Sequence, residues 1–164
     1  MNIEAPRLRQ LVDWPAAIKA GVISGLVFLI LNIVLVSIAV GSNGNFVIRY
    51  LASVLLGKGI LPPPEDFSLA ASFAALVATL FMAIVFSCII AYIVHRGGII
   101  AGVVGGAVLG LAFYMINFYT LTLLFPWFFA LTGWTMAINH IIFGALAGGI
   151  YEGLEEEIFV PVEQ

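Results

Sequence analysis

Few side chains in this sequence could do chemistry, and four of them stand inside long apolar stretches. They are Asn32, Asn117 and the adjacent pair Asn139 and His140. At 100° per residue, Asn32, Asn117 and His140 each fall on the glycine-bearing face of their predicted helices. Because that face is expected to point into a helix bundle, we predict a polar intramembrane cluster of Asn32, Asn117, Asn139 and His140 towards the outer ends of the helices.

Such a cluster has two possible roles. Intramembrane polar residues are candidates for a functional site. Interhelical hydrogen bonds from Asn and His also hold helices together, at roughly 0.6 kcal/mol each on average. Since no Asp, Glu, Lys or Arg stands deep in any apolar stretch, the pattern favours packing over a transport or proton-relay site.

The residue types give little support for haem binding, zinc binding or catalysis. Two axial haem ligands must lie at similar depth, whereas His95 and His140 are predicted roughly 15–20 Å apart along the membrane normal. Zinc needs three or four closely spaced ligands, and the single Cys88 with two distant histidines does not supply them. We therefore expect no catalytic residues, no metal site and no enzyme. A haem shared with a partner subunit stays open, and bound lipid is expected.

Composition predicts a membrane protein. The 164 residues are 63% hydrophobic and only 9% charged, whereas soluble domains are roughly one quarter charged. The segments 20–48, 67–94 and 97–151 contain no Asp, Glu, Lys or Arg. A spanning helix needs about 20 apolar residues, so these segments have room for four. Six Lys and Arg in the whole chain form no basic patch for nucleic acid.

The predicted fold is an all-α integral membrane protein, a four-transmembrane-helix bundle forming a single membrane domain over 1–164. Asp13 and Pro15 are a typical helix start, and Asp66 or Ser68 could cap the second span. The predicted segments are spans at about 16–40, 67–94, 98–123 and 134–151, an interfacial helix at about 45–56, and an acidic C-terminal tail at 152–164.

The segment 45–56 is too short to span the membrane. It carries Phe46, Tyr50 and Val54 along one side, with Arg49 and Ser53 next to them. This amphipathic pattern is typical of a helix lying in the headgroup plane.

Small residues recur every fourth position through the predicted spans. In lipid, helices associate through close packing, and stripes without side chains let two backbones approach. We therefore predict a glycine zipper between helices, with packing positions at Gly21, Gly25, Gly98, Gly102, Gly106, Gly110, Gly144 and Gly148. The second span carries a similar stripe of small residues, namely Ala71, Ala75, Thr79, Ala83, Ser87 and Ala91.

The sequence also contains an internal repeat. The pattern G-x-x-x-G-x-x-F-x-x-x-N occurs at 21–32 and again at 106–117. More loosely, Phe86-Ser87 matches Phe143-Gly144. We predict a duplicated helical hairpin, with the interfacial helix inserted in the first copy and the copies related by an axis along the membrane normal.

Positive charge marks the cytoplasmic side of membrane proteins. One predicted side carries Arg7, Arg9, Lys19 and Arg96, and the other only Arg49 and Lys58. Both termini are therefore expected on the cytoplasmic side of the inner (cytoplasmic) membrane.

The favoured function is a non-catalytic small membrane subunit that stabilises or assembles a larger membrane complex. Its predicted partners are the lipid bilayer and other integral membrane subunits, or a second copy of itself, and no nucleic acid. One alternative is a small transporter or channel with a polar site at Asn32, Asn117 and His140. Another is a haem- or quinone-associated subunit of an electron-transfer complex.

Overall fold

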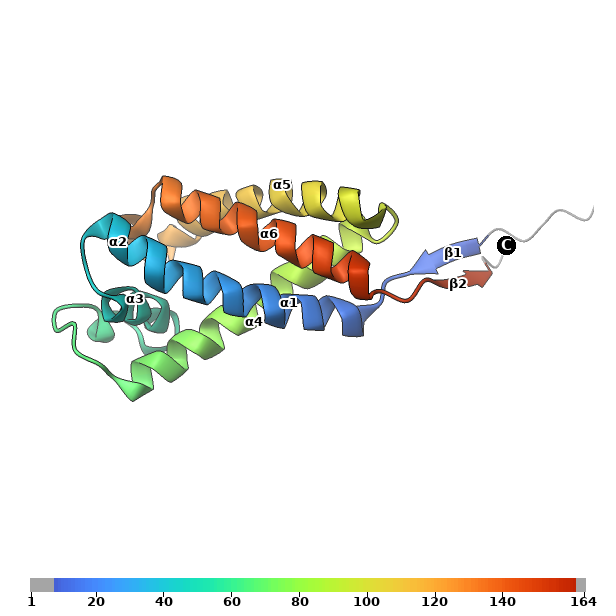
Figure 1. Ribbon diagram of the computed structural model, residues 1–164. Helices are drawn as coiled ribbons and strands as arrows, with labels where there is room; N and C mark the ends of the chain where they lie inside the picture. The colour runs from blue at the N-terminus through green and yellow to red at the C-terminus, as the bar shows by residue number, and fades with distance from the viewer. Residues whose placement is uncertain (1–7, 162–164) are drawn as a thin grey trace, which may run out of the picture.

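The protein is an elongated helical bundle with a short two-stranded ribbon at one end (Figure 1). The computed structural model describes residues 8–161, so the ends of the predicted terminal segments, 1–7 and 162–164, lie outside the described residues. The larger helices are α1 (Trp14–Leu31), α3 (Gly44–Leu56), α4 (Leu69–Val94), α5 (Gly98–Tyr119) and α6 (Trp134–Leu154). The shorter segments are π-helical η1 (Asn32–Val36), α2 (Ser37–Val40), and the 3₁₀ turns η2 (Lys58–Ile60), η3 (Leu121–Leu123) and η4 (Pro126–Leu131).

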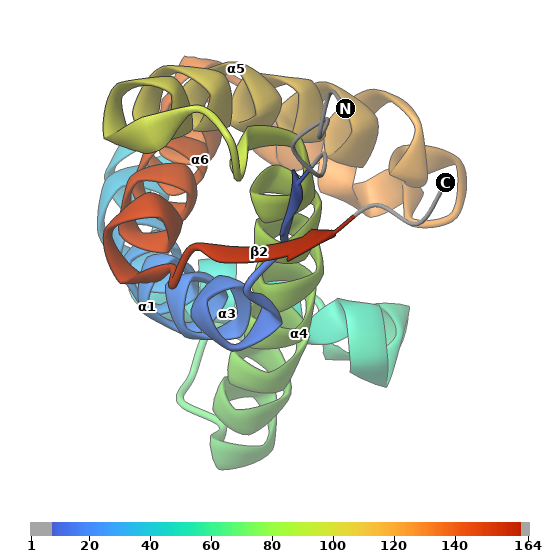
Figure 2. The ribbon, with the colours of Figure 1, turned by 90° about the vertical axis from the view of Figure 1, so that its right-hand side faces the viewer.

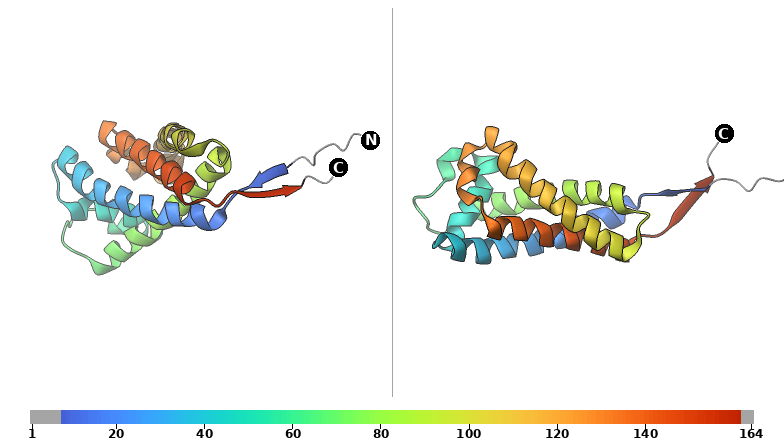
Figure 3. Two further views of the ribbon diagram at one scale, coloured as in Figure 1. Left: turned by 45° about the vertical axis from the view of Figure 1, so that its right-hand side comes forward. Right: turned by 90° about the horizontal axis from the view of Figure 1, so that it is seen from above.

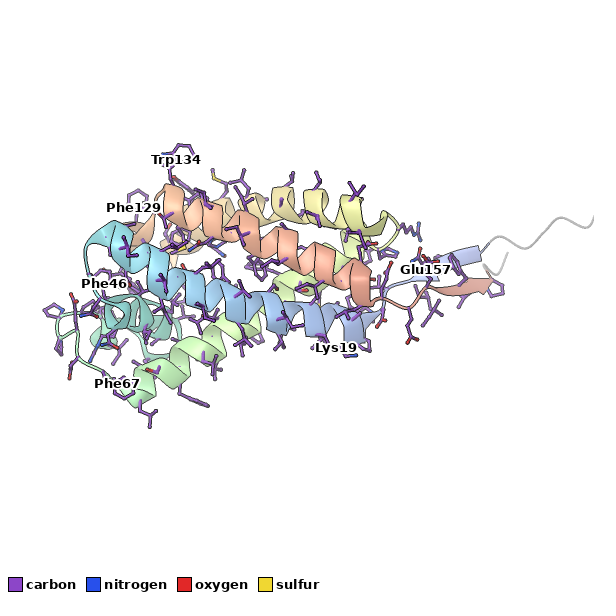
Figure 4. All side chains as sticks on the ribbon, viewed as in Figure 1. Lys19, Phe46, Phe67, Phe129, Trp134 and Glu157 are labelled. Atoms are coloured by element: carbon purple, nitrogen blue, oxygen red, sulfur yellow. The ribbon has the colours of Figure 1, made fainter. Side chains whose placement is uncertain are left out.

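Three of the described helices are long and apolar enough to cross a membrane, which indicates a membrane protein, as composition predicts. They are Trp14–Val40, which joins α1, η1 and α2, then Leu69–Val94 and Gly98–Tyr119. Many of their large apolar side chains point outward (Figure 4). Such a surface suits hydrocarbon and would be costly in water.

Local polar groups set where the helices begin. The Asp13 side chain accepts a hydrogen bond from the Ala16 amide at 3.0 Å, and proline follows in the first turn of α1. Ser68 caps α4 by accepting from the Ala71 amide. Asp66, the alternative cap, instead pairs with Arg49.

Glycine brings helix backbones into close contact. A Cβ built on Gly21 would lie 2.7 Å from the Ile84 Cα, and one on Gly25 would lie 2.6 Å from the Ala83 Cβ. These contacts bring α1 against α4. Between α5 and α6, which run side by side in Figures 1 and 3, the carbonyls facing Gly102, Gly106 and Gly110 are those of Gly148, Gly144 and His140.

Gly98 differs from the other predicted packing glycines. It is exposed, a Cβ there would meet no atom within 4 Å, and its φ is +73°. Its role is to form the turn between α4 and α5, where a left-handed backbone favours glycine.

The half of the bundle nearest the ribbon is tightly closed. Ala17, Ala20, Ile90, Ala147 and Tyr151 are fully buried there. The Ser87 hydroxyl donates a 2.8 Å hydrogen bond to the Ala17 carbonyl and joins α4 to α1. The small residues therefore leave little free space in this half.

The two ends of the described chain meet, which the sequence analysis did not predict. β1 (Leu8–Leu11) pairs antiparallel with β2 (Ile158–Pro161). This ribbon projects beyond the helices in Figure 1, and Figure 2 looks at the bundle from the ribbon end. The predicted acidic tail therefore begins as the last turn of α6, and its described part, up to residue 161, includes a strand. Asp13 adds a contact, since its carboxylate accepts a hydrogen bond from the Glu156 amide at 3.1 Å.

The structure corrects the predicted faces of α3. Its fully or nearly buried residues are Val47, Arg49, Ala52 and Ser53, so the polar side predicted beside the apolar stripe is an inner side. The helix packs against α4. Arg49 is accommodated because Asp66 and two carbonyls accept its hydrogen bonds.

Candidate functional site

A cavity of about 170 Å³ lies in the half of the bundle farther from the ribbon. Its walls are mostly apolar, and four polar residues line it: Asn32, Thr79, Asn117 and His140. The structure thus brings three of the four residues of the predicted polar cluster to one cavity. Aromatic side chains supply much of the remaining wall, namely Phe28, Phe86, Phe118, Phe125, Phe128 and Phe143.

His140 projects from α6 and is almost fully buried, with 4% of its surface exposed. Its Nδ1 lies 2.9 Å from the Met136 carbonyl, and because a carbonyl only accepts, Nδ1 carries a proton. In a neutral imidazole, Nε2 is then an acceptor, and the Asn117 Nδ2 donates to it at 3.2 Å. The hydrogen-bond network therefore assigns one tautomer to His140.

Aromatic rings hold the His140 imidazole in place. The Phe28 ring approaches it edge-on with centroids 4.8 Å apart, and Tyr114 and Phe118 lie at 5.6 and 5.8 Å. Edge-to-face contacts of this kind add directional stabilisation to simple burial. The imidazole is thus held by rings from α1 and α5.

Asn32 is fully buried and stands at the first position of the π-helical segment η1. Its Nδ2 donates to the Phe28 carbonyl at 2.8 Å, whereas its Oδ1 has no partner within residues 8–161. Single π-helical turns inside longer helices occur frequently at functional sites. The irregular turn therefore coincides with a residue that lines the cavity and carries an unpartnered oxygen.

Thr79 is the polar wall residue that the sequence analysis placed only in a packing stripe. It is 7% exposed, and its hydroxyl has no partner in the described part of the chain. Helical hydroxyls usually bond the carbonyl one turn back, as Ser24, Ser72 and Thr122 do here. Thr79 does not, so its hydroxyl is a buried polar group without a partner in the described part of the chain.

Asn117 supplies a third unpartnered atom. Its Nδ2 bonds His140, whereas its buried Oδ1 has no partner among the described residues. Asn139, the fourth member of the predicted cluster, is fully buried but does not line the cavity. Neither of its amide atoms has a partner in residues 8–161.

The cavity is partly open, and its more accessible wall lies towards α3 and the end of α5. Val54 of α3 lines it and is exposed, and Asn117 is only half-buried. In the bundle around it, α5 packs mainly against α6 and only lightly against α4. Trp127 ties the η4 wall to α3 by donating to the Ser53 hydroxyl at 2.8 Å.

Arg49 stands near this region and was not predicted as an inner residue. It is 6% exposed, and it donates to Asp66 Oδ1 at 2.9 Å and to the carbonyls of Ile60 and Asp66, each at 3.2 Å. These bonds tie the connector before α4 to α3. Arg49 thus fixes an element of the cavity wall and does not line the cavity itself.

The two histidines have separate surroundings. The His95 Nδ1 lies 2.9 Å from the Tyr92 carbonyl at the ribbon-side end of α4, far along the bundle from His140. Within residues 8–161, no group of three His, Cys, Asp or Glu side chains is placed to hold a metal ion.

Comparisons with known proteins give no match from which a function could be inferred. No protein-family model, curated protein or solved structure matches this chain. The geometry of the cavity therefore carries the functional argument. Helix periodicity in the sequence predicted that Asn32, Asn117 and His140 lie together. It did not predict the contributions of Thr79, the aromatic side chains and α3 to the cavity wall, which depend on tertiary packing.

Proposed function

We propose that this protein binds a small, largely apolar molecule inside the membrane, in the cavity lined by Asn32, Thr79, Asn117 and His140. The observation that carries the proposal is a partly open, largely apolar cavity of about 170 Å³ whose wall also holds these four polar residues. Ligand sites are typically apolar cavities with a few convergent polar groups.

The proposed membrane arrangement has four spans, the fourth being residues 134–151 of α6. A helix of this length is about 27 Å long, close to the thickness of the hydrocarbon core. The excess of Lys and Arg on the ribbon side supports cytoplasmic termini in an inner membrane. Phe46, Phe67, Phe129 and Trp134 lie towards the opposite end (Figure 4), where aromatic residues suit a membrane interface and α3 would lie.

Reciprocal contacts support the proposed duplicated hairpin. Phe28 of the first copy contacts Phe143 of the second, with ring centroids 5.6 Å apart. The equivalent pair with the copies exchanged is Phe113 with Phe86, at 4.1 Å. Such an exchange of partners is the signature of two-fold symmetry, and a glycine zipper within each hairpin fits the same arrangement.

The cavity would then lie between the two repeats. Asn32 and Asn117 are equivalent positions of the repeat, as are Thr79 and Met136, and all four line it. In transporters built from repeats, ligand sites lie at the repeat interface. Because the ribbon-side half of this bundle is closed, the geometry favours binding over a continuous channel.

The proposed role is non-catalytic. The polar wall consists of two amides, a hydroxyl and an imidazole, and the hydrogen-bonded imidazole has both nitrogens engaged. Nucleophilic catalysis needs a nucleophile next to a free base. The wall groups are therefore better suited to recognition than to bond cleavage.

Filling the cavity tests the proposal. Ala78 lines the cavity, whereas Ala112 is an exposed residue of α5, so Ala78→Phe and Ala112→Phe are matched variants. Native mass spectrometry of the gently extracted full chain should show a small-molecule adduct on the wild type and on Ala112→Phe. Ala78→Phe should lack it. Identical adduct patterns on all three proteins would reject the site.

The accessory-subunit hypothesis is tested separately. The outward apolar faces of α1, α4 and α5 suit acyl chains and partner helices equally. A native gel of the same extract should show the chain with other membrane subunits if that hypothesis holds. Migration of the chain alone would count against it and leave the ligand proposal intact.

A further inference from the structure

The polar residues of the cavity wall turn most of their hydrogen-bonding atoms into the protein. Asn32 Oδ1, Thr79 Oγ1 and Asn117 Oδ1 are buried, and both ring nitrogens of His140 lie within hydrogen-bond distance of protein atoms. The surface that the wall presents to the open space is almost entirely carbon. The cavity therefore offers its occupant apolar contacts.

The volume of the cavity sets the size of the group that it can hold. This volume is about 170 Å³, and an apolar cavity of about 150 Å³ holds benzene, which has six carbon atoms. Phenylalanine and methionine side chains make up half of the wall, and methionine adapts its shape to irregular space. A hydrocarbon group of about six carbon atoms therefore fills the cavity.

The cavity opens at the depth of the bilayer hydrocarbon. Met82 of α4 lines it and keeps part of its surface exposed, and it lies near the middle of a helix long enough to cross a membrane. Its neighbours Phe81 and Val85 are exposed and apolar. The mouth of the cavity is thus continuous with the outward apolar face of α4.

We propose that the cavity holds one hydrocarbon chain of a membrane lipid, whose headgroup stays outside. This inference rests on the proposed function and specifies its ligand. No Asp, Glu, Lys or Arg lines the cavity, and an isolated charge in an apolar site is strongly disfavoured, so a charged headgroup does not enter. About six carbon atoms of the chain occupy the space, and the rest of the chain passes Met82 into the bilayer.

Packing supplies the driving force for this binding. Between protein and lipid the hydrophobic effect gives no net gain, because both surroundings are apolar. The atoms that line an empty cavity, however, lack contact partners on one side, and a chain that enters restores those contacts. Water fills such a space poorly, because it needs several polar partners. The bilayer supplies hydrocarbon directly at the mouth.

Photo-crosslinking in nanodiscs tests the inference. The probe is a phosphatidylcholine that carries a diazirine on one acyl chain, mixed into nanodiscs that hold the full chain, and peptide mass spectrometry maps the labelled residues. Asn32 and Phe143 line the cavity and are buried, whereas Ile30 of α1 points outward and is 60% exposed. Surrounding lipid reaches Ile30 but not Asn32 or Phe143. We expect all three to be labelled, each with the mass of the phospholipid.

Variants assign the inward labelling to the cavity. Ala78→Phe fills the space, so the labelling of Asn32 and Phe143 relative to Ile30 should fall about tenfold. Ala112→Phe, on the exposed face of α5, should leave that ratio unchanged. Thr79→Val keeps the side-chain shape and should also leave it unchanged, because the Thr79 hydroxyl does not face the space. Far-UV circular dichroism of each variant checks folding.

The outcomes separate the two proposals. Labelling of Ile30 without Asn32 or Phe143 in the wild type overturns the lipid-chain assignment, while the adduct experiment with Ala78→Phe still decides whether the cavity binds another molecule. Inward labelling that persists in Ala78→Phe would place the chain elsewhere. Loss of inward labelling in Thr79→Val would show that the hydroxyl takes part in recognition, which overturns binding through apolar contact.

Discussion

At the scale of single residues, buried oxygens without partners lower the stability of the fold. The Thr79 hydroxyl is buried without a partner, so Thr79→Val should stabilise the ligand-free fold by about 1 kcal/mol. Thr122→Val is the control, because the Thr122 hydroxyl bonds the Phe118 carbonyl. Unfolding by SDS titration in mixed micelles measures both. Destabilisation by Thr79→Val would show that the hydroxyl has a partner after all.

Glu152 gives a pH-dependent prediction at the ribbon-side end, just beyond the proposed fourth span. Partial burial, and then repulsion from Glu155 and Glu157, raise the pKa of the Glu152 carboxyl above its ordinary value of 4.5. The folded state then binds the proton more tightly than the unfolded state, so stability falls as pH rises from about 4.5 through the raised pKa.

Glu152→Gln should remove this loss. The variant should be more stable than the wild type at pH 8 and should differ less at pH 4. Thermal unfolding in detergent at the two pH values measures the effect. A variant that is less stable at pH 8 would indicate a favourable interaction of the charged carboxylate.

The position of a residue around its predicted helix indicates the environment of some residues here but not of others. Asn32 and Asn117 share a face with glycines, and that face is buried because side-chain-poor stripes pack. Thr79 stood in a stripe of small residues, where packing is the usual role. Whether its hydroxyl bonds its own helix depends on a side-chain rotamer, which one sequence does not reveal.

At the scale of elements, the α5–α6 contact depends on backbone approach. A Cβ on Gly106 would collide with the Gly144 carbonyl, whereas one on Gly105 would meet only a Val94 methyl group at 3.3 Å. Gly106→Ala should therefore destabilise the protein by about 3 kcal/mol. Gly105→Ala should have little effect, since the gain in helix propensity offsets a small shift.

The same SDS titration distinguishes the two glycine variants. Equal stability of Gly105→Ala and Gly106→Ala would mean that the two helices are farther apart than described. The close contact would then contribute little to the stability of the fold.

A second element-scale prediction concerns α3. Asp66→Asn removes the carboxylate that faces the buried Arg49 guanidinium and should loosen α3 from α4. Hydrogen exchange of the α3 amides should become faster, with little change in the ribbon-side half of α4. Because Asp66 is itself well exposed, the cost should be modest, about 1 kcal/mol. Unchanged exchange would mean that apolar contacts alone hold α3.

The lengths of the apolar stretches predicted the long helices to within a few residues, because each crossing requires a fixed length of apolar chain. The ribbon was not predicted, because its two strands come from opposite ends of the chain and their pairing leaves no local pattern in the sequence. The buried side of α3 was not predicted, because the Arg49 guanidinium donates hydrogen bonds to Asp66 and to carbonyls of the following connector. Helix periodicity does not indicate these partners.

At the scale of the whole molecule, the proposed topology places η2 outside the cell and the α4–α5 turn inside. In a Cys88→Ala background, Lys58→Cys should react with a membrane-impermeant maleimide in intact cells. Arg96→Cys should react only after permeabilisation. The opposite pattern would invert the topology, and labelling of both would contradict the proposed number of spans between them.

The cavity arises from the arrangement of the whole bundle, because α1, α3, α4, α5, η4 and α6 all contribute to its wall. The most direct test is an experimental structure of the purified full chain in lipid nanodiscs. The account predicts non-protein density in the cavity, in contact with Thr79, Asn117 or His140. A cavity closed by protein side chains, or asparagines turned towards lipid, would contradict it.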